Sequence, residues 1–422
     1  MLPSYLAYTG WGLVRGPGSV IGDWLARGDP ARSVLANEVL AVGGLALWAW
    51  PIAAFVMASG VRRVPEHLLE ALRLEPAGIW TRLRMLVGLV RGEVIAAVGI
   101  VALVMAGSAI PLHLAQIDTA AIHLWKYMSL TTSPAAVWPA ALPLTGAALI
   151  GTLCVVRWVE RSDGAGEELG GIEHASRSAR AWTVGVWMLS VAGPLAMFVL
   201  HLRDWSSLAA FWRTSWSAVG GSLRVAGVVG VVCAVVCCGV FALRTCVGSR
   251  KHALRMGVGG LVFAGLVPGV LVGAAGLAFW TMPRAPDAGD LPIMLAHVAR
   301  FGFLGALMGW VLAGQESADE RGARVLSAGE TLRGWWSLRL VPNLGVVVGV
   351  GLASMALSIH EIESTVQLAT PGRANIAQRL LDLLHYSRDE ELCAACINLL
   401  FGGALLAFGA GWLIARVFRN GR

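Results

Sequence analysis

The charged stretch "ESADERGARVLSAGETLRGWWSLRLVP" (316–342) lies between two apolar segments, "FGFLGALMGWVLAG" (301–314) and "NLGVVVGVGLASMALS" (343–358). Each flanking segment approaches the roughly 20 apolar residues that a helix needs to cross a bilayer. The stretch between them is either an ordinary solvated loop or a shaped element that contacts another protein. The rest of the sequence helps to distinguish these two interpretations.

The composition is that of a membrane protein. Of the 422 residues, 56% are hydrophobic and only 14% are charged, whereas soluble domains carry about 25% charged residues. The mean hydropathy is +0.68. Long apolar segments without a period of two predict an all-α polytopic membrane protein and argue against a barrel. About nine spans are predicted, at about 36–58, 94–112, 136–156, 182–202, 225–246, 256–281, 293–314, 343–360 and 392–415.

The distribution of arginine predicts the orientation of these spans. Arg-rich segments follow the first, third, fifth, seventh and last spans, and all of them share one side if every span crosses. The positive-inside rule makes this side the cytoplasm. The predicted cytoplasmic segments are 59–93, 158–181, 247–255, 316–342 and the C-terminus, and 361–390 is predicted to be external.

A Gly-rich, charged segment, "ERSDGAGEELGGIEHASRSAR" (160–180), lacks apolar periodicity and predicts a cytoplasmic linker. It divides the chain into a first membrane half (1–158), the linker (159–181) and a second half (182–422). Such a division makes an internal repeat an obvious possibility.

A repeat is present in the predicted cytoplasmic segments, where "LRLEPAGIWTRLRML" (72–86) aligns with "ARVLSAGETLRGWWS" (323–337). In the second copy, Glu320 and Arg324 have the spacing of an i,i+4 ion pair on an exposed face. Ser327 followed by Glu330 predicts a capping box, so a new helix is expected to begin near Ser327. In the first copy, Pro76 takes the equivalent place, and proline is preferred at the first helical position. Each copy therefore predicts a helix–turn–helix.

These two copies resemble the cytoplasmic coupling ("EAA") loop of binding-protein-dependent ABC transporter permeases. The family pattern is Glu-Ala-Ala, three residues, then Gly, and Glu70-Ala71 and Ala323-Arg324 fall on its first part. The chain departs from the pattern at Pro76, where Gly is expected, and at Arg321, where Glu is expected. The resemblance implies an ATPase-coupling role for Glu70, Ala71, Pro76, Gly78, Ala323, Arg324, Ser327, Ala328 and Gly329.

A second resemblance is more specific. The segment "SIHEIESTVQLATPGRANIAQRLLDLLHYSRDEELCAACINLL" (358–400) resembles the last periplasmic loop of double-length permeases of the iron(III)/thiamine/phosphonate-type importers, and "LVPGVLVGAAGLAFW" (266–280) resembles their Pro-Gly-bearing span. The resemblance covers essentially the whole chain. It implies two pseudo-repeated halves of the type I importer fold in a bacterial inner membrane. The implied partners are two ABC ATPase subunits, a periplasmic solute-binding protein and the lipid bilayer.

The first half is short by comparison with this family. Only about three predicted spans precede the linker, whereas the resemblance implies about six, and "LPSYLAYTGW" (2–11) resembles "VPGVLVGAAG" (267–276). We therefore expect the chain to begin inside the equivalent of a third span. Residues 1–33 are then expected to form no full crossing.

Three residues are candidates for the translocation path of a small solute. Glu361 and Thr365 end a predicted span that would line the central cavity, and Arg300 lies early in the seventh span. An ionisable residue inside the membrane indicates a functional site, but an arginine near a helix end can also extend its side chain to the interface. His201, His297 and His360 lie near span ends, where an interfacial histidine needs no function.

Other function classes have little support in the sequence. The phosphate-binding motif G-x-x-x-x-G-K-[ST] is absent, so we predict no enzyme activity and assign ATP hydrolysis to a separate subunit. The net charge of +7 is spread through loops, which argues against nucleic-acid binding. No cofactor or metal is predicted, since "CAAC" (393–396) has no second ligand pair. The alternative function is that of a membrane scaffold with a degenerate permease fold, or of another membrane protein that does not transport.

Overall fold

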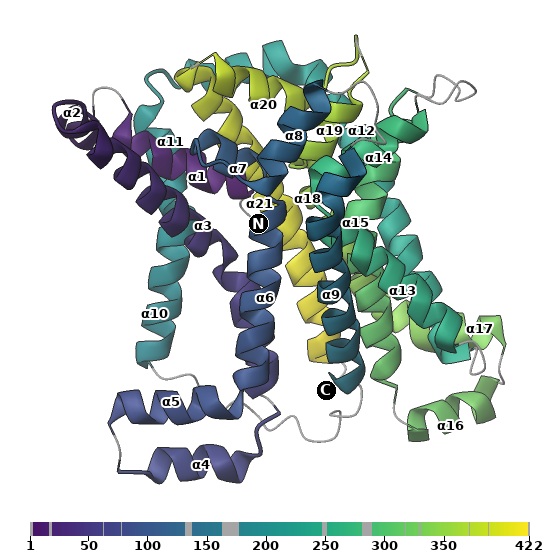
Figure 1. Ribbon diagram of the computed structural model, residues 1–422. Helices are drawn as coiled ribbons and strands as arrows, with labels where there is room; N and C mark the ends of the chain where they lie inside the picture. The colour runs from purple at the N-terminus through teal and green to yellow at the C-terminus, as the bar shows by residue number, and fades with distance from the viewer. Residues whose placement is uncertain are drawn as a thin grey trace.

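The computed structural model is a bundle of helices, and no strand occurs among the residues that it describes (Figure 1). The structure describes all residues except 1–2, 17–18, 62, 77, 131–136, 163–176, 247–250, 281–288, 317, 329–330, 371, 387 and 421–422. The first helices are α1 (Ser4–Gly12), α2 (Val20–Ala26), α3 (Pro30–Val61), α4 (Glu66–Leu74), α5 (Ile79–Leu89), α6 (Arg91–Gly107), α7 (Ile110–Leu114), α8 (Ala120–Leu130) and α9 (Trp138–Ser162).

The remaining helices form the larger part of the bundle. They are α10 (Arg177–Trp187), α11 (Gly193–His201), α12 (Ser206–Cys246), α13 (Lys251–Leu266), α14 (Gly269–Trp280), α15 (Leu291–Gly314), α16 (Ala318–Ala328), α17 (Leu332–Trp335), α18 (Val341–Ile359), α19 (Glu363–Leu368), α20 (Ile376–His385) and α21 (Asp389–Asn420). Two π-helical turns, Met188–Ala192 and Trp336–Leu340, connect α10 to α11 and α17 to α18.

Seven of the described helical segments are long and apolar enough to cross a membrane. They are Pro30–Val61, Trp138–Glu160, Ser178–His201, Ser206–Thr245, Leu291–Gly314, Arg333–Ile359 and Asp389–Val417. Two further pairs meet the same criteria only together, α5 with α6 and α13 with α14, and they bend by 80° and 107°. The prediction of a polytopic all-α membrane protein is confirmed, with seven spans or up to nine if each bent pair is one span.

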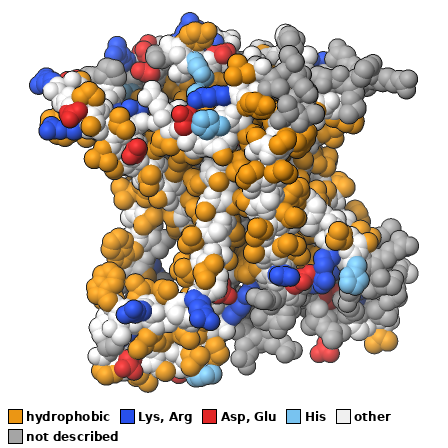
Figure 2. All heavy atoms as spheres, in the orientation of Figure 1, with side chains coloured by type: hydrophobic (Ala, Val, Ile, Leu, Met, Phe, Trp, Pro, Cys, Tyr) orange, Lys and Arg blue, Asp and Glu red, His pale blue; other side chains and the backbone are white. Residues whose placement is uncertain are grey.

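A belt of hydrophobic side chains surrounds the middle of the visible face, and charged side chains gather toward its two ends (Figure 2). Helix α12 shows how the belt arises. Its Val231 and Val235 are 65% and 63% exposed, whereas Cys233 and Cys237 are fully buried. Residues four apart share a helix face, so an apolar face points away from the protein. A helical stretch that is apolar on both its exposed and its buried face is suited to a lipid environment.

Two predicted spans have the wrong extent. The segment 256–281 was expected to be one span, but the helix breaks at Val267–Pro268, where proline supplies no N–H to continue the helical hydrogen bonds. The span 225–246 was expected to start near residue 225, but α12 begins at Ser206. Its 41 residues extend about 60 Å, well beyond the roughly 30 Å of hydrocarbon, because polar residues such as Arg213 and Arg224 do not interrupt the helix.

Close packing of α12 against α15 depends on two glycines. A Cβ on Gly305 would overlap the carbonyl of Cys233, and one on Gly309 would overlap the carbonyl of Cys237. Their spacing is the small-x-x-x-small pattern that lets membrane helices approach closely. Helix α12 also packs against α18 and α21, so it lies at the centre of the second part of the bundle.

The helix–turn–helix elements α4–α5 and α16–α17 lie at one end of the molecule, whereas α8 and α20 lie at the other (Figure 1). The predicted cytoplasmic segments 59–93 and 316–342 therefore share an end, as the arginine distribution requires. Which side of the membrane this end faces stays a prediction. Near the N-terminus, α1 and α2 have nine and seven residues, so neither is long enough to cross.

The described helices fall into two series of similar order. In the first series, a short helix (α1) precedes a long one (α3), the element α4–α5, then α6, two short helices (α7 and α8) and the long α9. In the second series, α14 precedes α15, the element α16–α17, then α18, α19, α20 and the long α21. Most of the predicted linker, 163–176, lies outside the described residues, so the division at 158 and 182 stays a prediction.

Single cysteines can test the predicted orientation. Tyr386 is 76% exposed just after α20, and Ser327 is exposed on α16, so the two positions mark opposite ends. We expect a membrane-impermeant maleimide added to spheroplasts to label Tyr386→Cys but not Ser327→Cys, because the Arg-rich end is predicted to be cytoplasmic. The unsubstituted chain is the control for native cysteines. Labelling of Ser327→Cys alone would reverse the orientation.

Candidate functional site

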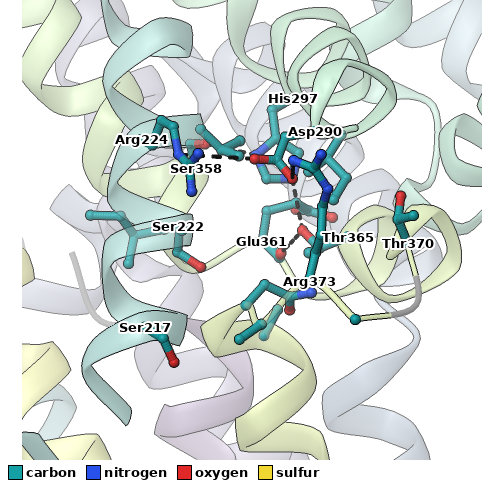
Figure 3. Close-up of a pocket in the computed structure, with 18 residues that line it drawn as sticks. Ser217, Ser222, Arg224, Asp290, His297, Ser358, Glu361, Thr365, Thr370 and Arg373 are labelled. Atoms are coloured by element: carbon teal, nitrogen blue, oxygen red, sulfur yellow. Dashed lines mark hydrogen bonds and ion pairs between the residues drawn. The ribbon is translucent and has the colours of Figure 1, made fainter. Parts of the chain in front are cut away.

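A polar pocket lies near the end of the bundle that carries α20 (Figure 3). Its walls come from α12, the start of α15, the end of α18, helix α19, Thr370 and residues 372–377. The cavity volume is about 380 Å³, at the lower end of the range of ligand pockets, about 300–1,000 Å³. The pocket therefore has room for a small solute.

The inner part of the pocket is a network of buried polar side chains around His297, which is 2% exposed. The two ring nitrogens of His297 lie 2.7 Å from Ser358 Oγ and 2.8 Å from Thr365 Oγ1. Glu361 Oε1 accepts hydrogen bonds from the backbone N–H and the hydroxyl of Ser364. These contacts fix the end of α18 and the start of α19 against the first turns of α15.

Behind this network lies a charge cluster, formed by Arg300, Glu361 and Glu363. Arg300 Nη2 is 3.4 Å from Glu361 Oε2, and Arg300 Nη1 is 3.6 Å from Glu363 Oε2. Both carboxylates are buried, at 8% and 7% exposure. Glu363 Oε1 also accepts a hydrogen bond of 2.7 Å from the backbone N–H of Ala109, so the cluster joins α19 to the start of α7.

The break between α13 and α14 meets this charge cluster at Gly269. A Cβ on Gly269 would overlap the Arg300 guanidinium and would lie 2.6 Å from Glu363 Oε2. Only glycine therefore lets the backbone approach so closely without moving the ions. The Pro268-Gly269 pair both breaks the helix and provides the space that the charge cluster occupies.

The rim of the pocket carries two arginines and one carboxylate. Arg373 Nη1 is 3.3 Å from Asp290 Oδ1, and Arg224 Nε is 4.0 Å from Asp290 Oδ2. The side chains of Arg224 and Arg373 are 65% and 50% exposed, whereas that of Asp290 is 14% exposed. Figure 3 shows Arg224 on α12 and Arg373 on the opposite wall, both directed toward Asp290.

The structure brings together the three residues that the sequence proposed for a translocation path. Glu361 and Thr365 line the pocket, and Arg300 lies directly behind Glu361. Arg300 forms ion pairs with two buried carboxylates, which argues against a side chain extended to the interface, and its role in a functional site stays a prediction. His297 was interpreted as an interfacial histidine, but it is buried in the pocket wall, one helical turn before Arg300 on the same face.

The first helix–turn–helix places its predicted coupling residues on an exposed surface. Glu70 and Ala71 are exposed on α4, and Pro76 and Gly78 are exposed in the connection to α5. The prediction that Pro76 takes the first helical position is wrong. Helix α5 begins at Ile79 with Gly78 as its N-cap residue, because the chain stays extended at Gly78. Arg82 Nη2 donates to the carbonyl of Glu75 at 2.8 Å and closes the turn.

The second helix–turn–helix differs from its prediction in two ways. Ala323, Arg324, Ser327 and Ala328 all belong to α16, which ends at Ala328, so no helix begins at Ser327. Thr331 instead accepts a hydrogen bond from the N–H of Gly334 at the start of α17. Gly329 and Glu330 lie outside the described residues, as does the Glu320 side chain.

Arg324 does not lie on an exposed face, as the predicted ion pair with Glu320 required. It is 6% exposed, and its Nε donates to Glu316 Oε1 at 2.9 Å. Arg339 Nε lies 3.5 Å from the same oxygen. The Glu316 side chain, which is fully buried, thus ties α16 to the turn before α18. This buried triad of Glu316, Arg324 and Arg339 holds α16–α17 against the bundle.

The two elements are anchored unequally. Trp335 of α17 is 3% exposed and its ring contacts that of Phe241 on α12, with centroids 5.4 Å apart. In α5, by contrast, the described residues include none that is buried, and Trp80 is 80% exposed. The first element therefore projects from the bundle, whereas the second is packed onto it.

Comparisons with known proteins identify no relative. No family model, curated protein or solved structure matches the chain. Among the described residues, no group of three His, Cys, Asp or Glu side chains is placed to hold a metal ion. The fold thus defines the class, a multi-pass α-helical membrane protein, and the permease resemblance stays a hypothesis.

Removing the buried carboxylate of Glu316 should destabilise the protein strongly. Glu316→Gln removes the charge of the carboxylate that Arg324 and Arg339 share, and breaking a buried ion pair costs about 3–5 kcal/mol. The matched control is Glu93→Gln, whose ion pair with Arg63 at 3.6 Å is partly exposed, so that loss should cost about 0–1 kcal/mol. The free energy of unfolding in detergent is the measurement. Equal effects of the two changes would contradict a structural role for the triad.

A side chain at Gly269 should disturb the charge cluster. Gly269→Ala must displace Arg300 from its carboxylates, and we expect a loss of about 1–3 kcal/mol in the free energy of unfolding. At Gly402 on α21 a Cβ meets no heavy atom within 4 Å, so Gly402→Ala should be neutral or should stabilise the helix by up to about 1 kcal/mol. If Gly269→Ala left the free energy of unfolding unchanged, the backbone at Gly269 would not be in close contact with Arg300 and Glu363.

Proposed function

We propose that this chain is the permease subunit of a binding-protein-dependent ABC importer in a bacterial inner membrane. The observation that carries the proposal is the shared position of α4–α5 and α16–α17 at one end of the bundle (Figure 1). Each element follows a long apolar helix and precedes the next one. Two matching elements at one end are what two copies of a docking partner require.

The similar order of the two helix series supports pseudo-repeated halves. The repeated sequence at 72–86 and 323–337 falls on α4–α5 and α16–α17, which hold the same place in their series. In the proposed fold, α3 and α15, α6 and α18, and α9 and α21 are equivalent pairs. The helices α10 to α13 have no equivalent in the first series among the described residues.

The exposed apolar side chains of the first element support docking by another protein. Leu74, Ile79 and Trp80 are 79–82% exposed around the turn. Apolar side chains grouped on an exposed surface commonly mark an interaction site. In the proposal, one ATPase subunit covers α4–α5 and a second covers α16–α17. We assign ATP hydrolysis to these subunits because this chain lacks the phosphate-binding motif.

In the proposed mechanism, ATPase closure moves the two elements toward each other and changes the access of a central path. The second element transmits this motion through the Glu316 triad to α15 and α18. Helices α15 and α18 in turn carry His297, Arg300 and Ser358. A periplasmic binding protein would deliver the solute at the end that carries α8 and α20.

A membrane scaffold that no longer transports is the second candidate. The departures of Pro76 and Arg321 from the coupling-loop pattern favour it, because they change residues that would contact the ATPase. Association with an ATPase distinguishes the two functions: a transporter must bind one, and a scaffold need not.

A bulky residue at Gly78 tests the docking role. A Cβ there meets no heavy atom within 4 Å, so Gly78→Trp can be accommodated in the isolated chain but would obstruct a docked partner. We expect at least about tenfold weaker binding of the ATPase subunits, since about 1.4 kcal/mol of steric cost suffices. Binding and solute-stimulated ATP hydrolysis in the reconstituted complex are the measurements.

The matched control is Gly185→Trp on α10. A Cβ at Gly185 also meets no heavy atom within 4 Å, but this residue lies on a helix long and apolar enough to cross the membrane. This variant should bind the ATPase and hydrolyse ATP like the unsubstituted chain. Normal ATPase binding by Gly78→Trp, with normal transport, would show that α4–α5 is only a solvated loop.

A further inference from the structure

The pocket between α12, α15 and α19 has opposite excess charges at its two ends. From this arrangement we propose that it binds a small zwitterionic solute, with a cationic amine at the Glu361 end and an anionic group at the Arg224 and Arg373 end. That this ligand is also the transported solute rests on the proposed function. The binding site itself does not.

The rim has more positive than negative charge. Arg224 and Arg373 share one carboxylate, Asp290, at 4.0 and 3.3 Å, and no other ion pair of these two arginines occurs among the described residues. Both guanidinium groups are at least half exposed, so one stays available to an incoming anion. Arginine also suits this role because its planar fork pairs with a carboxylate or phosphate through two hydrogen bonds.

The inner end has more carboxylates than cations. Glu361 and Glu363 both face the single guanidinium of Arg300, at 3.4 and 3.6 Å. These contacts are long, and in the described structure Arg300 Nη1 and Glu363 Oε2 make no hydrogen bond although both atoms are buried. Buried charged groups are normally paired and hydrogen-bonded. An ammonium group beside Glu361, which lines the pocket, would supply the missing positive charge.

The other walls fit a short, partly apolar ligand. Val225 and Ile293 contribute apolar surface to the lining, and the hydroxyls of Ser217 and Thr370 lie on opposite walls (Figure 3). Apolar surface beside polar groups that fix the orientation of a ligand is typical of small-molecule sites. The volume of about 380 Å³ excludes a large solute.

The pocket is built mainly from the second helix series. Its walls come from α15, α18, α19 and residues 372–377, and from α12, which has no equivalent in the first series among the described residues. The inference is therefore one site per chain.

Binding of a matched set of small molecules tests the charge arrangement. The probes are γ-aminobutyrate and 6-aminohexanoate, which carry both charges, butanoate, which is only an anion, and butylamine, which is only a cation. Isothermal titration calorimetry on the full chain in lipid nanodiscs gives each affinity. We expect at least one amino acid to bind at least about tenfold more tightly than butanoate and butylamine, because only it satisfies both ends.

Two substitutions assign the ends. Arg373 is half exposed, so the protein should tolerate Arg373→Gln. This change is expected to weaken binding of the amino acid by at least about tenfold and to leave binding of butylamine unchanged. Glu361→Gln is expected to weaken the binding of both the amino acid and butylamine. Arg213→Gln, on the exposed surface of the same α12 and outside the pocket, is the matched control and should change nothing.

Each result bears on the inference. Equal affinities for the amino acids, butanoate and butylamine, no binding of any probe at millimolar concentration, or no effect of Arg373→Gln would each overturn it. If γ-aminobutyrate or 6-aminohexanoate binds as expected but the complex with an ATPase shows no uptake, the proposed function fails and the site remains. If the complex transports while no zwitterion binds, the site fails and the proposed function remains.

Discussion

The ion cluster of Arg300, Glu361 and Glu363 is the constraint on which the rest of the structure depends, because three breaks in helical backbone meet at it. Helix α13 ends before Gly269, α18 ends before Glu361, and α6 ends before Ala109, whose N–H is bonded to Glu363. Backbone groups freed by a break inside a membrane protein need partners within the protein. One guanidinium and two carboxylates supply charge and hydrogen-bond acceptors where the broken ends come together.

The sequence predicted the elements better than their limits. Apolar length identified the spans, since length and hydropathy are local properties, but Pro268 broke a segment that hydropathy alone joined. The two helix–turn–helix elements were predicted as two short helices each, yet the capping residue in the second is Thr331 and not Ser327. Which of two nearby hydroxyls caps a helix depends on where the preceding helix ends, and α16 continues past Ser327 to Ala328.

The site was predicted only in part. Arg300 was identified because an ionisable residue is costly inside a membrane, and Glu361 and Thr365 because they end a predicted span that would line a central cavity. Glu363 carried the same signal two residues after Glu361 and could have been included. His297 and Arg224 could not have been assigned, because their significance comes from neighbours far along the chain, Thr365 and Asp290. Sequence position reveals that a polar residue is in the membrane but not what it faces.

The hydrogen bond from Ala109 to Glu363 has a consequence for synthesis in the cell. Its partners are 254 residues apart, and ribosomes add about 5–20 residues per second. The start of α7 must therefore wait on the order of 10–50 s before its acceptor is made. During this time the backbone donor at Ala109 lacks its final acceptor. The final arrangement at the start of α7 is reached only after α19 has been made, so the two series complete their folding together.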